Sequence, residues 1–95
     1  MAAIEFSPRA LFDLEEITDY IARDNPKRAG SFAEELKAHC FRIAENPEAY
    51  AYRRDLSRGL RMAVHGRYLI YFRSGTSGVR IVRILHSARR TPGSM

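Results

Sequence analysis

The chain of 95 residues has no tryptophan and a single cysteine, Cys40, so it has no internal disulfide and no metal site built from several cysteines. Its apolar runs extend over only a few residues, too short to cross a membrane. The opening MAAIEF lacks the basic flank and apolar stretch of a secretory signal, so we expect a cytoplasmic protein. With six glycines, four prolines and no visible repeat, the composition is that of a globular protein.

Lysine is missing from the second half of the chain, and this absence belongs to a wider division of charge. Residues 1–46 contain six lysines and arginines against nine acidic residues, a net charge of −3. Residues 47–95 contain ten arginines against two acidic residues, a net charge of +8. This division suggests that the C-terminal half binds a polyanion or an acidic partner. The alternative is a solvated basic face that only keeps the protein soluble.

Two amphipathic helices are predicted in the first half. Ser7-Pro8 marks the first start, because the hydroxyl can accept a free backbone N–H and proline suits the first helical position. An apolar stripe at helical spacing follows, formed by Ala10, Leu14, Ile17 and Ile21. The expected polar face carries Asp13, Glu15, Glu16 and Asp19.

A second start signal, Asp24-Asn25-Pro26, begins the next helix after almost no loop, and Asn46-Pro47 ends it. Its inner face is marked by Ala29, Phe32, Leu36, Cys40 and Ile43. Helices joined this tightly are expected to fold back as an antiparallel hairpin.

Four short β-strands are predicted around this hairpin, at residues 3–6, 60–65, 67–73 and 79–86. In the second of them, Leu60, Met62 and Val64 are expected on the buried side. The order is β-α-α-β-β-β, which gives an α+β class. We expect a helical hairpin packed on one face of a mainly antiparallel, curved sheet, within one domain that comprises residues 1–95.

The arginines of the strands are expected on the sheet face that the helices leave open. Arg61 and Arg67 fall opposite the apolar set. Arg80 and Arg83 differ by three positions, so a regular strand cannot send both to one face. One of these two is therefore expected near a sheet edge.

Five stretches of the chain, taken in order, resemble the RelE/ParE superfamily of bacterial toxins, and more closely its ParE branch. They are IEFSPRALFDLEEITDYIA, NPKRAGSF, AENP, LSRGLRMAVHGRYLIYFR and VRIVRILHSARR. The resemblance covers nearly the whole chain. It implies a compact toxin that is co-expressed with a ParD-like antitoxin, whose C-terminal segment wraps the toxin and holds it inactive.

The superfamily hosts two activities on one fold, so the fold does not decide the function. RelE-like members are ribosome-dependent endoribonucleases that use lysines and arginines of the central strands with a late proton donor. Here the second half has no lysine, and the tail TPGSM has no titratable side chain. If the chain is a nuclease, His86 is the acid–base group, and Arg61, Arg67 and Arg89 hold phosphate. A similar ILHxxR ending is usual in the ParE branch without nuclease activity, which favours a structural role for His86.

ParE-like members poison DNA gyrase by trapping its cleaved DNA, which requires no catalytic residue of the toxin. Binding of antitoxin, gyrase or DNA would then use a basic face with aromatic side chains. The candidates are Arg53, Arg54, Arg58, Arg61, Arg73, Arg80, Arg83, Tyr50 and Tyr52. The two tyrosines can equally pack the connecting segment, residues 47–58, against the sheet edge.

We therefore expect the toxin of a type II toxin–antitoxin module that inhibits DNA gyrase and blocks replication. The first alternative is a RelE-like endoribonuclease, and the second is a non-toxic module that binds DNA or its partner to co-regulate an operon. No cofactor is expected. His39 and His65 are interpreted as ordinary surface or boundary residues, because three scattered histidines and one cysteine do not make a zinc site.

Overall fold

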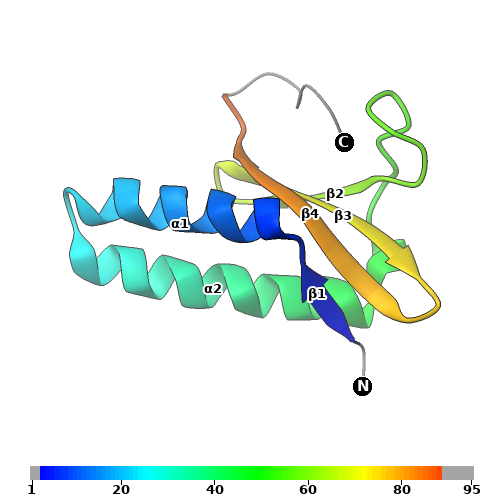
Figure 1. Ribbon diagram of the computed structural model, residues 1–95, viewed down its shortest axis with the longest axis horizontal. Coiled ribbons are helices and arrows are strands. Elements are labelled where there is room, and N and C mark those ends of the chain that lie inside the picture. Colours follow the sequence, from blue (N-terminus) through cyan, green and yellow to red (C-terminus); the bar gives the residue numbers. More distant parts are fainter. Residues whose placement is uncertain (1–2, 89–95) are drawn as a thin grey trace.

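The computed structural model describes residues 3–88 and has the predicted element order β-α-α-β-β-β (Figure 1). The elements are β1 (Ile4–Phe6), α1 (Pro8–Ala22), α2 (Pro26–Glu45), β2 (Arg61–His65), β3 (Tyr68–Gly75) and β4 (Gly78–His86), with a short 3₁₀ turn at Pro47–Ala49. The predicted α+β class is confirmed. Within residues 3–88, neither helix is long and apolar enough to cross a membrane.

Both helices begin where the sequence predicts, and for the predicted reason. The Ser7 hydroxyl accepts the Ala10 N–H at 2.9 Å, and the Asn25 side chain accepts the Arg28 N–H at 3.1 Å. A proline follows each of these caps. Each cap satisfies a donor that the first turn of a helix leaves free, which contributes about 1 kcal/mol.

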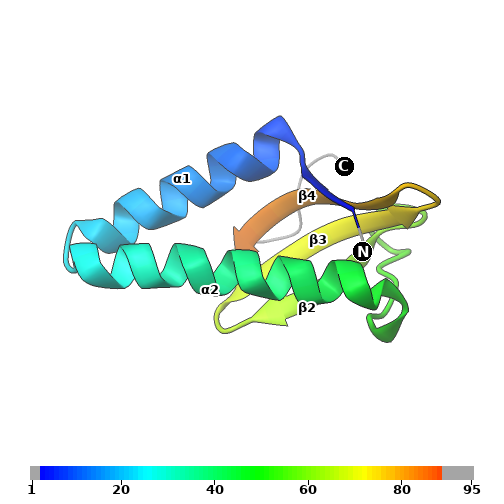
Figure 2. The same ribbon diagram turned by 90° about the horizontal axis from the view of Figure 1, so that it is seen from below.

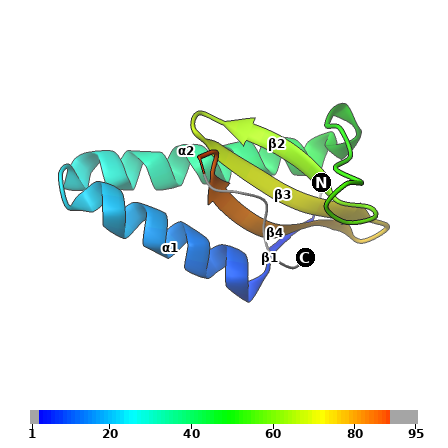
Figure 3. The same ribbon diagram turned by 90° about the horizontal axis from the view of Figure 1, so that it is seen from above.

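The four strands form one sheet in the order β1-β4-β3-β2. β2, β3 and β4 pair as an antiparallel meander, whereas β1 pairs with β4 in parallel. Seen from below, α2 passes in front of β2 and β3 (Figure 2), and the opposite view has the sheet in front of α2 (Figure 3). The helices therefore cover one face, and we call the other face the outer face.

The main core lies between the helical hairpin and the covered face. Leu36 and Ile43 of α2 and Ile70, Phe72 and Ile81 of the sheet are all 0% exposed. Burying each such side chain contributes about 1.5–3 kcal/mol relative to leaving it in water, which is what holds the hairpin on the sheet.

The face of β2 is the reverse of the predicted one. The antiparallel register pairs Ala63 with Ile70 and Arg61 with Phe72, so Ala63 and Arg61 point toward the helices. Met62 lies on the outer face, and Val64 is 58% exposed. The alternation was predicted correctly, but a strand with apolar residues on both faces does not reveal its orientation, because a shift of one residue exchanges the faces.

The outer face is apolar at its centre, which corrects the expectation of a face displaying arginines. Leu60, Tyr71 and Leu85 form a second buried cluster there. Partly buried apolar side chains surround it, namely Leu56, Met62, Leu69 and Val82. The connecting segment before β2 contributes to this cluster through its leucines.

An irregularity in β4 places both of its arginines on one side of the sheet. The register pairs Tyr71 with Arg83 but Phe72 with Ile81, so Val82 is an extra residue. In a regular strand, side chains three positions apart point to opposite faces. The extra residue of the bulge shifts this alternation by one, so Arg80 and Arg83 both lie on the outer side. The sequence contains no turn residue that announces this bulge.

Gly78 is the glycine on which the pairing of β1 depends. Its φ of 129° is a conformation that L side chains rarely adopt, and a Cβ at this position would collide with the Ala3 carbonyl. The Ala3 carbonyl accepts the Val79 N–H at 3.0 Å. Glycine therefore permits the close approach that starts the parallel pair.

Candidate functional site

A buried ion pair joins α1 to the edge of β4. Arg83 donates from Nε to Asp13 Oδ2 at 2.7 Å and from Nη2 to Oδ1 at 3.1 Å. The same carboxylate accepts the Ile84 N–H at 3.0 Å. The two side chains are only 2% and 15% exposed, for Asp13 and Arg83 respectively. β1 ends at Phe6, so within the described residues the part of β4 that follows Ile81 has no strand beside it on this edge. Asp13 therefore accepts the Ile84 N–H, which a neighbouring strand would otherwise have bonded.

This pair corrects the placement of Asp13 on the solvated face of the first helix. It also identifies Arg83 as the arginine at the sheet edge. Its guanidinium is committed to a carboxylate inside the fold, so Arg83 is not one of the cations that face solvent.

Three other predicted binding arginines also have partners within the fold. Arg80 Nη1 lies 2.6 Å from Glu5 Oε1, across the parallel β1–β4 pair. Arg73 donates to the Arg58 carbonyl at 2.6 Å and to the Ser57 hydroxyl at 2.7 Å. These two bonds tie the connecting segment to β3.

Arg53 forms a bidentate pair with Asp55, with N···O distances of 3.0 and 2.8 Å. The side-chain hydrogen bonds lower the pKa of Asp55 and raise the pKa of Arg53. In contrast, neither Arg54 nor Arg58 forms an ion pair within the described residues.

Arg61 is the buried cation at the start of β2. It is 9% exposed and donates to the Tyr50 carbonyl at 2.7 Å and to the Tyr52 hydroxyl at 2.9 Å. Its guanidinium lies 4.0 Å from the centre of the Tyr52 ring. Tyr50 packs edge-on against Phe72, with ring centroids 5.7 Å apart, whereas Tyr52 is 43% exposed. The packing role considered for both tyrosines therefore applies to Tyr50.

His86 lines a cavity of about 630 Å³ between α1 and the ends of β3 and β4. Arg67, Arg23 and Tyr68 also line it. His86 Nδ1 accepts the Ala88 N–H at 3.0 Å, which leaves the ring proton on Nε2. Its ring lies edge-on to Tyr68 at 5.2 Å, and burial raises the pKa of Tyr68. The backbone bond is the contact expected of a structural histidine at a strand end.

The residues proposed for nuclease chemistry are only partly brought together. Arg67 and His86 line the same cavity. Arg61 begins β2 and Arg67 follows its end, so roughly 13 Å of strand separates them. Arg61 also points toward the helices. Arg89 lies outside the described residues.

A histidine pair was missed from the sequence. His39 of α2 and His65 of β2 approach with their Nδ1 atoms 2.9 Å apart. Burial lowers the pKa of both rings, and for His39 the charge of His65 lowers it further. Among residues 3–88, no group of three or more histidine, cysteine or acidic side chains is placed to hold a metal ion. The pair therefore acts as a hydrogen-bonded contact between α2 and the edge strand.

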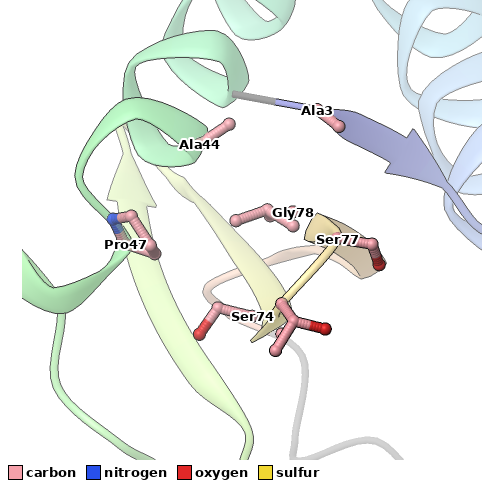
Figure 4. Close-up of a pocket in the computed structure, with 9 residues that line it drawn as sticks. Ala3, Ala44, Pro47, Ser74, Ser77 and Gly78 are labelled. Carbon is pink, nitrogen blue, oxygen red and sulfur yellow. The ribbon is translucent and has the colours of Figure 1, made fainter. Parts of the chain in front are cut away.

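A smaller cavity of about 250 Å³ lies by the β3–β4 turn (Figure 4). Its labelled lining residues are Ala3, Ala44, Pro47, Ser74, Ser77 and Gly78. No charged or titratable side chain lines it. This cavity can therefore offer only hydroxyl and backbone groups to a ligand.

Comparison with known families identifies the family to which this chain belongs. Residues 4–91 match the family described as the ParE toxin of the type II toxin–antitoxin system, parDE. The chain belongs to the ParE toxin family. A curated relative, Toxin RelE2 of Caulobacter vibrioides, is 37% identical over 89 residues, which are 94% of this chain and 99% of the relative.

The fold of this ParE-family chain is also that of a solved structure described as the chromosomal ParDE TA system from P. aeruginosa. The TM-score is 0.78 at 19% identity, over 90% of this chain and 96% of the other. The predicted membership of the ParE branch is thus confirmed. The Caulobacter relative carries the name RelE2, so family membership alone does not identify the target of this chain.

Proposed function

We propose that this ParE-family toxin inhibits DNA gyrase by binding it, without breaking bonds itself, and that a ParD-like antitoxin neutralises it. Family membership supports the toxin–antitoxin setting. The observation that supports action by binding alone is that the cations which a nuclease would need around one phosphate are dispersed. Arg61 and Arg67 lie at opposite ends of β2, and three further arginines, Arg53, Arg80 and Arg83, are paired with carboxylates of the same chain.

Cleavage of RNA by its own 2′-hydroxyl needs a base, an acid and cations that converge on one phosphate. The centre of the outer face instead consists of Leu60, Tyr71 and Leu85. Arg61 is buried on the opposite side of the sheet at one end of β2. A binding toxin needs no such convergence, because gyrase supplies the chemistry.

The outer face is suited to an antitoxin segment with one apolar and one acidic side. Partly buried Met62, Leu69 and Val82 offer apolar anchors, and Arg80, 45% exposed, lies at the rim. A disordered segment gains affinity by folding onto such a surface and loses part of it to ordering. Arg80→Glu is expected to weaken antitoxin binding at low salt more than at high salt. Equal affinity of the variant and the wild-type chain for the antitoxin at low salt would contradict electrostatic capture at this rim.

The proposal is tested with purified chain, gyrase and supercoiled plasmid. Linear plasmid after detergent and protease treatment is the expected result, and addition of the antitoxin encoded by the neighbouring reading frame should abolish it. Intact plasmid at every concentration of the chain would contradict the proposal. The same protein with translating ribosomes should leave mRNA intact.

Ribosome-dependent endoribonuclease activity is the second candidate, and the cavity that His86 shares with Arg67 favours it. Specific mRNA cuts that disappear in His86→Ala and weaken in Arg67→Gln would establish it. Arg23→Gln removes the other arginine of the same cavity, which Asp13 and Glu16 also line, and serves as a control for electrostatics alone. No linear plasmid in the gyrase assay and no mRNA cuts in the ribosome assay would favour the non-toxic binding module.

A further inference from the structure

A buried arginine without a counter-ion among residues 3–88 is the starting observation. Arg61 is 9% exposed, and its acceptors are a backbone carbonyl and the Tyr52 hydroxyl, both neutral. Its Nε atom is buried and has no partner within residues 3–88. Buried charges are normally paired with an opposite charge, because removing a cation from water is costly. This unpaired positive charge lies beneath a surface aromatic ring.

Tyr52 is the ring that covers this charge. It is 43% exposed, and a second guanidinium, that of Arg54, lies 4.9 Å from its centre. Arg61 lies 4.0 Å from the same ring. Contacts between cations and the ring partly compensate the buried charge. The result is an exposed aromatic surface surrounded by positive charge.

We call residues 50–61 the arginine loop, which projects from the sheet beside β2 (Figure 3). It holds four arginines and one acid, Asp55, which Arg53 already binds. Bonds from Arg73 to the Arg58 carbonyl and the Ser57 hydroxyl hold the loop on β3. The loop backbone also closes on itself, from the Arg53 N–H to the Leu60 carbonyl at 2.7 Å. The backbone that carries exposed Arg54 and Arg58 is thus held in place before any ligand binds.

The chemistry of this surface favours nucleic acid over an acidic peptide. Phosphates are neutralised by exposed arginines, and bases stack on aromatic rings and guanidinium planes. A peptide needs apolar pockets for its anchoring side chains. The three cavities described in residues 3–88 are lined by other segments, and none includes a residue of the arginine loop.

We propose that the arginine loop is a DNA-binding element, in which Arg54 and Arg58 contact phosphates and Tyr52 stacks on an unpaired base above the charge of Arg61. The inference rests on the proposed inhibition of gyrase, because that action brings the chain next to the DNA that gyrase holds cleaved. It assigns to the toxin a DNA contact of its own.

The test measures binding of the purified chain to a fluorescein-labelled duplex with a single-stranded overhang, by anisotropy over a series of salt concentrations. Arg54→Gln with Arg58→Gln should weaken binding at low salt at least about tenfold and reduce the salt slope by about 1.8, two phosphate contacts at 0.9 each. Lys27→Gln with Lys37→Gln removes the same charge from α2 and should leave binding nearly unchanged. Far-UV circular dichroism checks that each variant is folded.

Tyr52→Ala should weaken binding to the overhang more than to a blunt duplex, whereas Tyr52→Phe loses only the hydroxyl that accepts from Arg61, keeps the stacking ring and should retain most of the affinity for the overhang. Equal losses in the loop and α2 variants would overturn the proposal and leave only net charge. Binding of poly-glutamate but not of DNA would overturn it in favour of an acidic protein partner.

The plasmid assay separates this inference from the proposed function. If the loop variant loses DNA binding and linear plasmid falls with it, both stand. If the loop variant binds DNA as tightly as the wild-type chain while linear plasmid still forms, the inference falls alone and the proposed function stands. If the wild-type chain binds DNA through the loop but never yields linear plasmid, the proposed function fails and the DNA site remains.

Discussion

Removal of either partner of the Asp13–Arg83 pair should destabilise the fold severely. Asp13→Ala leaves a guanidinium that is 15% exposed without its carboxylate, and the Ile84 N–H without its acceptor. Breaking a buried pair in this way costs about 3–5 kcal/mol. Small domains are stable by only about 5–15 kcal/mol, so the midpoint of thermal unfolding should fall by at least about 12 °C.

A double variant separates the ion pair from the space it fills. Asp13→Leu with Arg83→Met replaces both charges with apolar groups; the buried Ile84 N–H then lacks a partner, and exposed Arg9 loses its contact with Asp13 at 3.7 Å. Such a site should cost about 1–3 kcal/mol, less than either single change. The exposed pair Arg28–Glu35, with side chains 47% and 52% exposed, is the matched control, and its removal should cost at most about 1 kcal/mol.

Urea unfolding followed by circular dichroism measures each of these free energies. The reasoning fails if Asp13→Ala and Arg83→Ala cost no more than the Arg28–Glu35 control. It also fails if the double variant is less stable than both single variants. Removing both charges together should cost less free energy of unfolding than leaving one buried charge without its partner.

Three further predictions concern the histidine pair, a glycine and a cap. Burial lowers the pKa of His39 and His65 below the ordinary 6.5, so the unfolded chain binds more protons and stability should fall as the pH drops through 6.5. Unfolding of His39→Gln with His65→Gln should depend less on pH from about 7 to 5, and an unchanged dependence would exclude the pair as its source. Gly78→Ala should cost about 1–3 kcal/mol of unfolding free energy through strain, and a neutral result would contradict the close approach to Ala3. Ser7→Ala should cost about 1 kcal/mol or more, because its hydroxyl also donates to the Val82 carbonyl at 2.9 Å, and a loss limited to a few tenths would contradict both contacts.

The helices could be predicted because their signals are local. Ser7-Pro8 and Asn25-Pro26 form contacts within one turn, so the caps are visible in the sequence itself. The antiparallel meander of β2, β3 and β4 followed from the short turns between them, whereas the parallel pairing of β1 with β4 joins distant segments and was not predicted. These features together were sufficient for the α+β class.

The site depended on contacts that no local pattern reveals. Asp13 and Arg83 are 70 positions apart, and an acidic residue on a helix is ordinarily solvated. His39 and His65 are 26 positions apart and meet only when α2 crosses β2. The sequence shows the charge of Arg61 but not its side of the sheet, because apolar residues occupy both faces of β2 and the outer face is apolar at its centre.

Plasmid cleavage by gyrase, in the presence of the wild-type chain and of His86→Ala, tests most directly whether this toxin acts by binding. Equal amounts of linear plasmid with both proteins are predicted, because the proposal leaves bond breaking to gyrase and gives His86 only its backbone contact with Ala88. No linear plasmid with either protein, together with mRNA cuts that need His86, would contradict it.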